Sequence, residues 1–105
     1  MQIKQLQAKA AKVFLGNLKR DNIDVGGDYL ILKLTEELGE FVQSYLIHQK
    51  RCRPGKYQLA RKTKRELSKE LADVLGIVMV IAKILKIDIE EALVKKWITR
   101  EWLKK

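Results

Sequence analysis

The chain has 105 residues, of which 47% are hydrophobic and 33% are charged. This length and composition predict one globular domain over residues 1–105 and exclude an intrinsically disordered chain. There are 22 Lys and Arg residues against 13 Asp and Glu residues, which gives a formal net charge of +9. Such an excess favours a polyanionic partner, either nucleic acid or a phosphorylated small molecule.

The apolar runs and the cysteine count limit where the chain is expected to work. The longest apolar run, residues 77–82, is too short to cross a membrane. Residues 1–18 mix Lys and Gln among their apolar positions, which argues against a secretory signal peptide, although the lack of acid before Asp21 leaves an organellar transit peptide open. The lone Cys52 fits a reducing compartment, so we expect a cytoplasmic protein without a disulfide. A single Cys and a single His, His48, cannot complete a zinc site.

Apolar residues that recur at spacings of three and four predict four helices and no strand. In chain order, these helices are expected to cover residues 2–20, 28–49, 63–85 and 88–105. Gly26 and Gly27 form the predicted turn before the second helix, and Asp28 is its predicted N-cap. The sequence therefore indicates an all-α fold.

Two further signals mark the second half of the chain. Pro54 and Gly55 interrupt the connection between the second and third helices. Asp88 and Glu91 have the spacing of a capping box at the start of the fourth helix, which we expect to continue to the end of the chain.

The third helix is apolar on nearly every side over residues 77–85. A helix with no polar face needs neighbours all round it, and four short helices from one chain supply too few. We therefore expect a homodimer or homotetramer that forms an oligomeric helical bundle, with the second and third helices as its antiparallel central pair.

The stretch LTEELGEF, residues 34–41, places three carboxylates in a chain that is short of acid. On a helical projection centred on the apolar face, Glu37 falls at about −85° and Glu40 at about −145°. Glu36 falls at about 180°, so it is expected to point to solvent and take no part in a site. Glu37 and Glu40 therefore form a pair at the edge of the buried face.

A second pair occurs in the third helix, in the stretch KELADVLGIV. Glu70 and Asp73 fall at about −80° and −140° on the equivalent projection. Because antiparallel helices that face one core turn the same flank toward each other, the two pairs are expected to converge. Four carboxylates in one small volume repel one another, and either protonation or a divalent cation relieves that repulsion.

Hard oxygen ligands without His or Cys select Mg²⁺, Mn²⁺ or Ca²⁺ rather than zinc. The alternative is a set of ordinary surface ion pairs along each helix. In that case Lys33 pairs with Glu36 or Glu37, and Glu66 or Glu70 pairs with Lys69 or Lys62.

The segments EELGE, residues 36–40, and ELAD, residues 70–73, together resemble the EExxE and ExxD motifs of the MazG-like nucleotide pyrophosphohydrolases. These form the all-α NTP pyrophosphatase superfamily, and the resemblance extends over about residues 28–97. It implies Mg²⁺-dependent hydrolysis of a nucleoside triphosphate to the monophosphate and pyrophosphate, with Mn²⁺ as an alternative metal and nucleotide-pool sanitation as one role. By motif position, the implied metal ligands are Glu37, Glu40, Glu70 and Asp73.

The same resemblance suggests the groups that act on the substrate. Glu37 or Glu40 is the implied proton acceptor for the attacking water. Lys33 lies on the same flank as these acids, at about −125°, and is a candidate phosphate contact. Lys96 matches a lysine that is common in the family, and Arg100 is a further candidate, although the Asn that often accompanies them is missing here.

Residues 50–65 hold eight Lys and Arg residues and no acid. This connection either binds phosphates or is a solvated charged loop. It also keeps a different function open, namely a basic all-α nucleic-acid-binding module whose carboxylate cluster is not catalytic. The paired acids make that alternative less favoured, because a nucleic-acid-binding module has no need of them.

Overall fold

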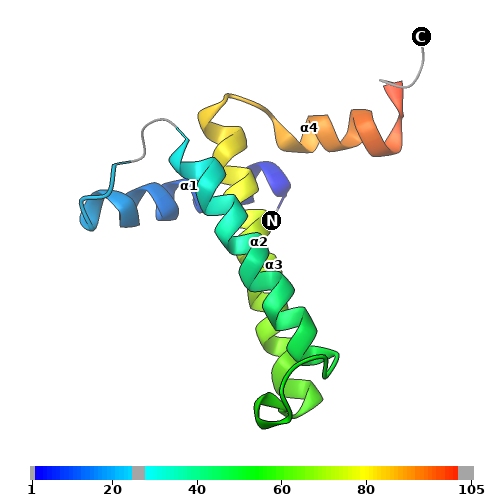
Figure 1. Ribbon diagram of the computed structural model, residues 1–105. Coiled ribbons are helices and arrows are strands. Elements are labelled where there is room, and N and C mark those ends of the chain that lie inside the picture. The colour runs from blue at the N-terminus through cyan, green and yellow to red at the C-terminus, as the bar shows by residue number, and fades with distance from the viewer. Residues whose placement is uncertain (1, 25–27, 102–105) are drawn as a thin grey trace. The chain divides into compact units, whose positions relative to one another are not determined.

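The computed structural model describes residues 2–24 and 28–101, and every regular element in those two ranges is helical (Figure 1). The α-helices are α1 (Ile3–Arg20), α2 (Tyr29–His48), α3 (Ala60–Ile84) and α4 (Ile89–Leu93). Two short helical segments are η1 (Pro54–Lys56) and η2 (Val94–Ile98). The all-α prediction is therefore confirmed for the described part of the chain, while the predicted Gly26–Gly27 turn lies outside it.

The chain forms two compact units, and α3 runs from one into the other. The first unit comprises residues 1–25 and 78–105, and the second comprises residues 26–77. None of the helices that the structure describes is both long enough and apolar enough to span a membrane.

In the first unit, α1 buries one face through residues spaced at four and seven, namely Gln7, Ala11 and Leu18. This spacing brings the three side chains to one side of the helix. The Gln7 amide donates hydrogen bonds to the carbonyl oxygens of Met79, at 3.4 Å, and Ile87, at 3.0 Å. Gln7 therefore ties α1 both to the end of α3 and to the α3–α4 connection.

The fourth helix differs from the prediction at its end. Its start agrees, because the Asp88 side chain accepts a hydrogen bond from the Glu91 amide at 3.1 Å. The α-helix ends at Leu93, however, and continues as the π-helical turn η2 only to Ile98. The predicted continuation to the end of the chain is therefore wrong.

Two physical reasons account for this early end. The Thr99 amide bonds back to the Val94 carbonyl at 2.8 Å, and Arg100 then takes a positive φ of 55°. A wide turn followed by a left-handed residue is a common helix ending. Trp97 and Ile98 are also 72% and 74% exposed, so no burial favours a longer helix at this point.

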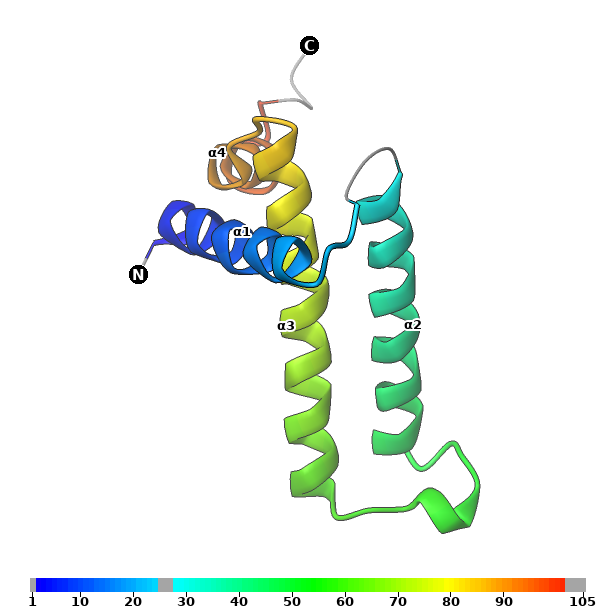
Figure 2. The ribbon, with the colours of Figure 1, turned by 90° about the vertical axis from the view of Figure 1, so that its left-hand side faces the viewer.

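In the second unit, α2 and the first part of α3 lie side by side and are joined by the connection that contains η1 (Figure 2). The helix α2 begins after Asp28, as predicted, although the Asp28 side chain makes no capping hydrogen bond. The helix α3 begins at Ala60, three residues earlier than Thr63, because the amides of Lys62 and Thr63 already bond to the Leu59 carbonyl.

A hydrogen bond joins the end of α2 to the start of α3. Nδ1 of His48 lies 2.7 Å from the hydroxyl oxygen of Thr63, and that hydroxyl donates to the Ala60 carbonyl at 3.0 Å. Because the hydroxyl proton is used in this way, we expect Nδ1 of His48 to be the donor of the shorter bond. Thr63 is only 3% exposed, so this pair fixes the start of α3 against α2.

Candidate metal centre

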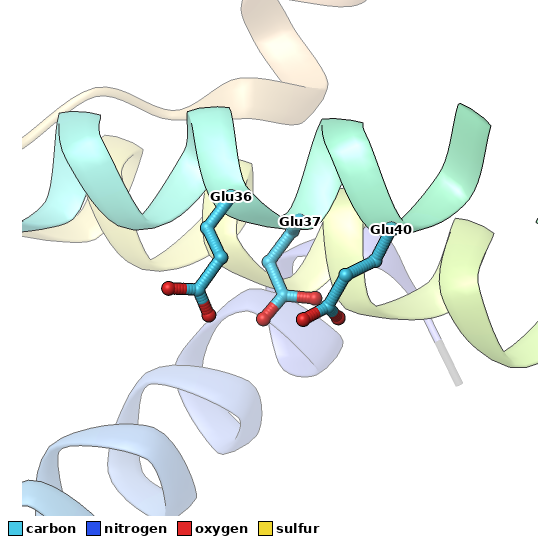
Figure 3. Close-up of side chains that lie close together, drawn as sticks. All are labelled: Glu36, Glu37 and Glu40. Atoms are coloured by element: carbon cyan, nitrogen blue, oxygen red, sulfur yellow. The ribbon is translucent and has the colours of Figure 1, made fainter. Parts of the chain in front are cut away.

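Three carboxylates project from closely spaced positions of α2, at Glu36, Glu37 and Glu40 (Figure 3). Residues three and four apart lie on one side of a helix, and glutamate side chains are long enough for their neighbours to meet. One carboxylate oxygen from each residue lies within 4.8 Å of the others. This turn of α2 therefore presents a compact set of oxygen ligands.

The helix α3 adds two more carboxylates to the same place. Oxygen atoms of Glu70 and Asp73 lie within 4.8 Å of each other and of an oxygen atom of Glu37. Glu37 thus belongs to two overlapping triads, one on α2 and one shared with α3. The structure brings together the two pairs that the sequence placed on matching flanks, and Glu37 is the residue that joins them.

Burial makes this arrangement costly without a cation. Glu37 is only 8% exposed. Oε2 of Glu37 and Oε2 of Glu70 are both buried, and neither has a hydrogen-bond partner among the described residues. A buried polar atom that lacks a partner costs about 1–3 kcal/mol, and more when it is charged. The unpaired oxygens and the all-carboxylate ligand set fit a hard divalent cation.

The protonation of two of these acids reflects the same crowding. Burial raises the pKa of Glu37, and the nearby carboxylates of Glu40 and Asp73 raise that pKa further, while Lys33 opposes the shift. Burial also raises the pKa of Glu70, again with contributions from Glu40 and Asp73. Both shifts show that negative charge on this cluster is disfavoured when no cation balances it.

Lys33 provides part of that balance from one turn earlier in α2. Its Nζ lies 2.7 Å from Oε1 of Glu36 and 3.5 Å from Oε1 of Glu37. The hydrogen bond to Glu36 is the main cause of the raised pKa of Lys33. The ion pairs considered for Lys33 are therefore present, and they lie inside the carboxylate cluster rather than apart from it.

Glu36 was expected to point to solvent and take no part in the site, and only the first half of this expectation agrees with the structure. Its side chain is 57% exposed, in agreement with its outward position on the helix. Its carboxylate nevertheless lies within reach of those of Glu37 and Glu40 and holds Lys33. The helical projection located the backbone correctly but missed this contact, because the three bonds of a glutamate side chain let it lean along the helix. The adjacent glutamates Glu36 and Glu37 were the sequence feature that could have indicated this contact.

The other predicted substrate contacts belong to the first unit. Lys96 lies in η2, and Arg100 follows that segment; both are exposed. Their assignment to substrate stays a prediction. His48 is not part of the cluster, since its ring bonds to Thr63.

The comparisons with known proteins give one match, which is to a family model. Residues 26–102, well over half of the chain, match the family model of the MazG nucleotide pyrophosphohydrolase domain. This range contains both carboxylate pairs. No curated protein and no solved structure gives a significant match. The chain therefore belongs to the MazG nucleotide pyrophosphohydrolase domain family.

Proposed function

We propose that the protein is a Mg²⁺-dependent nucleoside triphosphate pyrophosphohydrolase that releases the nucleoside monophosphate and pyrophosphate. The observation that carries this proposal is the pair of carboxylate triads that share Glu37, with buried and unpartnered oxygens on Glu37 and Glu70. Membership of the MazG family supplies the reaction class. The proposed role is the removal of unwanted triphosphates from the nucleotide pool.

The four carboxylates have distinct parts in this proposal. Glu37, Glu70 and Asp73 would hold the metal together with Glu40, and Mn²⁺ would be accepted in place of Mg²⁺. A bound metal ion would neutralise negative charge on the triphosphate. Because Glu37 joins both triads, its removal would break the ligand set at its centre.

Glu40 is the residue that we assign to the attacking water. It is exposed, unlike Glu37, and it belongs to only one of the triads. An exposed carboxylate at the edge of the cluster is accessible to a water molecule. Glu40 would accept one proton as the water oxygen bonds to phosphorus and the pyrophosphate leaves.

Lys33 would change partners when substrate binds. In the structure its ammonium group is held by Glu36 and Glu37. A cation held by Glu37 would free the ammonium group from that carboxylate. Lys33 would then exchange Glu37 for a phosphate oxygen and keep its shorter pair with Glu36. Lys96 and Arg100 are proposed as further phosphate contacts on the basis of the family resemblance.

We further propose that the active form is a homodimer or homotetramer with α2 and α3 as antiparallel central helices. The contacts between α2 and α3 support an antiparallel arrangement. Glu37 lies near Glu70, whereas His48, which is later in α2, bonds to Thr63, which is earlier in α3. Large apolar side chains on these two helices are exposed and would be covered by a second copy; they are Ile31, Leu38, Val42, Leu71 and Leu75. The free Cys52 is compatible with a cytoplasmic setting.

A direct assay tests the hydrolytic function. Purified protein is incubated with each ribonucleoside and deoxyribonucleoside triphosphate and Mg²⁺, and pyrophosphate release is measured beside Glu37→Gln and Glu36→Gln. We expect turnover of at least one triphosphate, loss of turnover in Glu37→Gln, and retention of most of it in Glu36→Gln. Absence of pyrophosphate release with every triphosphate in both Mg²⁺ and Mn²⁺ would refute the proposal.

A further inference from the structure

The connection between α2 and α3, together with the first two turns of α3, forms a strongly basic surface. We name as the basic end its eight side chains, all of them exposed: Lys50, Arg51, Arg53, Lys56, Arg61, Lys62, Lys64 and Arg65. Residues 50–65 contain no Asp or Glu. The proposed hydrolytic reaction uses none of these side chains.

The basic end is not neutralised within its own unit. Elsewhere in the described chain, Lys33, Lys69 and Lys95 each pair with an acid three or four residues away. None of the eight side chains of the basic end forms an ion pair with any described residue. Lys50 instead lies over the ring of Tyr57, with Nζ 5.8 Å from the ring centroid. Eight like charges therefore share one end of the helix pair without an internal counter-charge.

The direction of the α3 side chains separates this surface from the carboxylates. On a helical projection, Arg61, Lys62, Lys64 and Arg65 span an arc of about 160°. Thr63 is buried against α2 and lies about 180° from the centre of that arc. Glu70 falls within about 20° of Thr63 on the same projection. Asp73 falls about 80° from Thr63 and within about 20° of Lys62. The other three side chains of the arc, Arg61, Lys64 and Arg65, point away from the metal centre, so a nucleotide bound at the carboxylates would not neutralise them.

We propose that the basic end binds the phosphodiester backbone of a nucleic acid, in addition to the proposed hydrolysis of free nucleotides. A row of unpaired Lys and Arg side chains complements a chain of regularly spaced phosphates and gains affinity by releasing counterions. A single small phosphate ligand would engage only a few of these charges.

A membrane surface fits the same segment less well. Binding in the membrane interface needs apolar side chains that enter the lipid as well as basic ones. Leu59 is the large aliphatic side chain that the segment exposes, at 75%, and the Tyr57 ring is covered on one side by Lys50. One exposed leucine offers little apolar surface for insertion into lipid, whereas the same segment carries eight basic side chains. Charge complementarity therefore favours nucleic acid.

The test compares two variants that lose the same charge from different places. The first replaces the helical part of the basic end, as Arg61→Gln, Lys62→Gln, Lys64→Gln and Arg65→Gln. The control replaces exposed lysines of the first unit, as Lys9→Gln, Lys12→Gln, Lys19→Gln and Lys83→Gln. Gln is a good helix former, so both variants keep helix propensity, and circular dichroism verifies that each is folded.

Binding is measured by fluorescence anisotropy with labelled 20-nucleotide single strands and duplexes of DNA and RNA, over a range of NaCl concentrations. We expect wild type to bind with a strong salt dependence. For duplex DNA, the first variant should reduce the slope of log K against log salt by about 3–4, since each lost phosphate contact removes about 0.9. The control variant should stay within a few-fold of wild type.

Several results would overturn this inference. They are the absence of salt-dependent binding by wild type, equal weakening in both variants, and binding to vesicles of anionic lipid that the first variant loses while nucleic acid binding stays unchanged. Glu70→Gln separates this surface from the proposed reaction, because it should abolish pyrophosphate release and leave anisotropy binding intact. Retained hydrolysis in Glu70→Gln would contradict the proposed function alone.

Discussion

Lys33 and Glu37 lie one turn apart on α2, with Nζ 3.5 Å from Oε1, yet Oε2 of Glu37 is buried and has no hydrogen-bond partner among the described residues. One side of this carboxylate is therefore balanced by the chain itself, and the other side is not. Proteins seldom leave a buried charge half satisfied unless a function requires it. This relationship leads to predictions in which activity and stability change in opposite directions.

Replacing Glu37 by Gln should reduce pyrophosphate release while stabilising the metal-free protein. Loss of the central ligand is expected to reduce kcat by about 10²–10³, a typical effect of removing one group that stabilises charge in a transition state. Removing a buried, poorly balanced charge should raise the free energy of unfolding by about 1 kcal/mol. Steady-state kinetics and urea denaturation measure the two effects.

Glu36→Gln is the matched control, and we expect much smaller changes in both kcat and the free energy of unfolding. A Glu37→Gln protein that is less stable than wild type would contradict the argument.

Divalent cations should stabilise the wild-type protein against heat. A cation that binds only the folded state at about 100 times its Kd adds about 2.7 kcal/mol to the free energy of unfolding. We expect MgCl₂ or MnCl₂ to raise Tm by several degrees above the value in NaCl of equal ionic strength. This increase in Tm should disappear in Glu70→Gln, because the neutral glutamine side chain no longer offers a carboxylate to the cation. Equal shifts in wild type and Glu70→Gln would show that the cation acts elsewhere.

The raised pKa values of Glu37 and Glu70 predict how stability changes with pH in the absence of metal. A carboxyl group whose pKa is higher in the folded state than in the unfolded state binds more protons when folded. Its contribution to stability is fully present below the unfolded pKa, near 4.5 for a glutamate, and is lost as pH rises through the raised folded pKa. Relative to Glu70→Gln, wild type should therefore lose stability as pH increases from this point.

Paired urea denaturation curves at several pH values measure this difference, because titrations common to both proteins cancel. Addition of Mg²⁺ should reduce it, since a bound cation favours the ionised carboxylates. A difference between wild type and Glu70→Gln that is independent of pH would contradict the assigned shift.

Much of this site could be predicted from sequence because it depends on helix periodicity. Glu37 with Glu40, and Glu70 with Asp73, sit three residues apart on predicted helices, so their shared flanks followed from the backbone geometry. The contact of Glu36 did not follow, because it depends on side-chain torsions that residue spacing does not determine. Those torsions let the Glu36 carboxylate reach Glu37 and Glu40 although most of its side chain is exposed.

The ends of the helices were harder to predict than their centres. No glycine marks the end of the fourth helix, and Arg100 takes the left-handed backbone that glycine usually adopts. Likewise, the residue before Ala60 is Leu59, whose side chain has no hydrogen-bonding atom, so no capping residue signals that α3 begins there. At both places the backbone hydrogen bonds that form or fail to form depend on packing, which a pattern of apolar residues does not contain.

The buried amide of Gln7 should contribute to the stability of the first unit. Gln7→Ala removes the donor that satisfies the Ile87 carbonyl and is expected to lower the free energy of unfolding by about 1–2 kcal/mol. Urea denaturation measures this loss, and Lys9→Ala, an exposed position on the same helix, should change stability by less than about 0.5 kcal/mol. Equal effects at the two positions would mean that the Gln7 hydrogen bonds are not significant.

The hydrogen bond between His48 and Thr63 yields a prediction about a single proton. The Thr63 hydroxyl donates to the Ala60 carbonyl, so neutral His48 should carry its proton on Nδ1, the less common tautomer of a free histidine. Nitrogen chemical shifts of the His48 ring at pH 8 report this tautomer directly. Thr63→Val keeps the side-chain shape but lacks the hydroxyl, and it should cost about 1 kcal/mol and return the ring to the Nε2-protonated form. Thr63→Ser should retain the Nδ1 tautomer, and an Nε2-protonated ring in wild type would show that the hydroxyl donates to His48 instead.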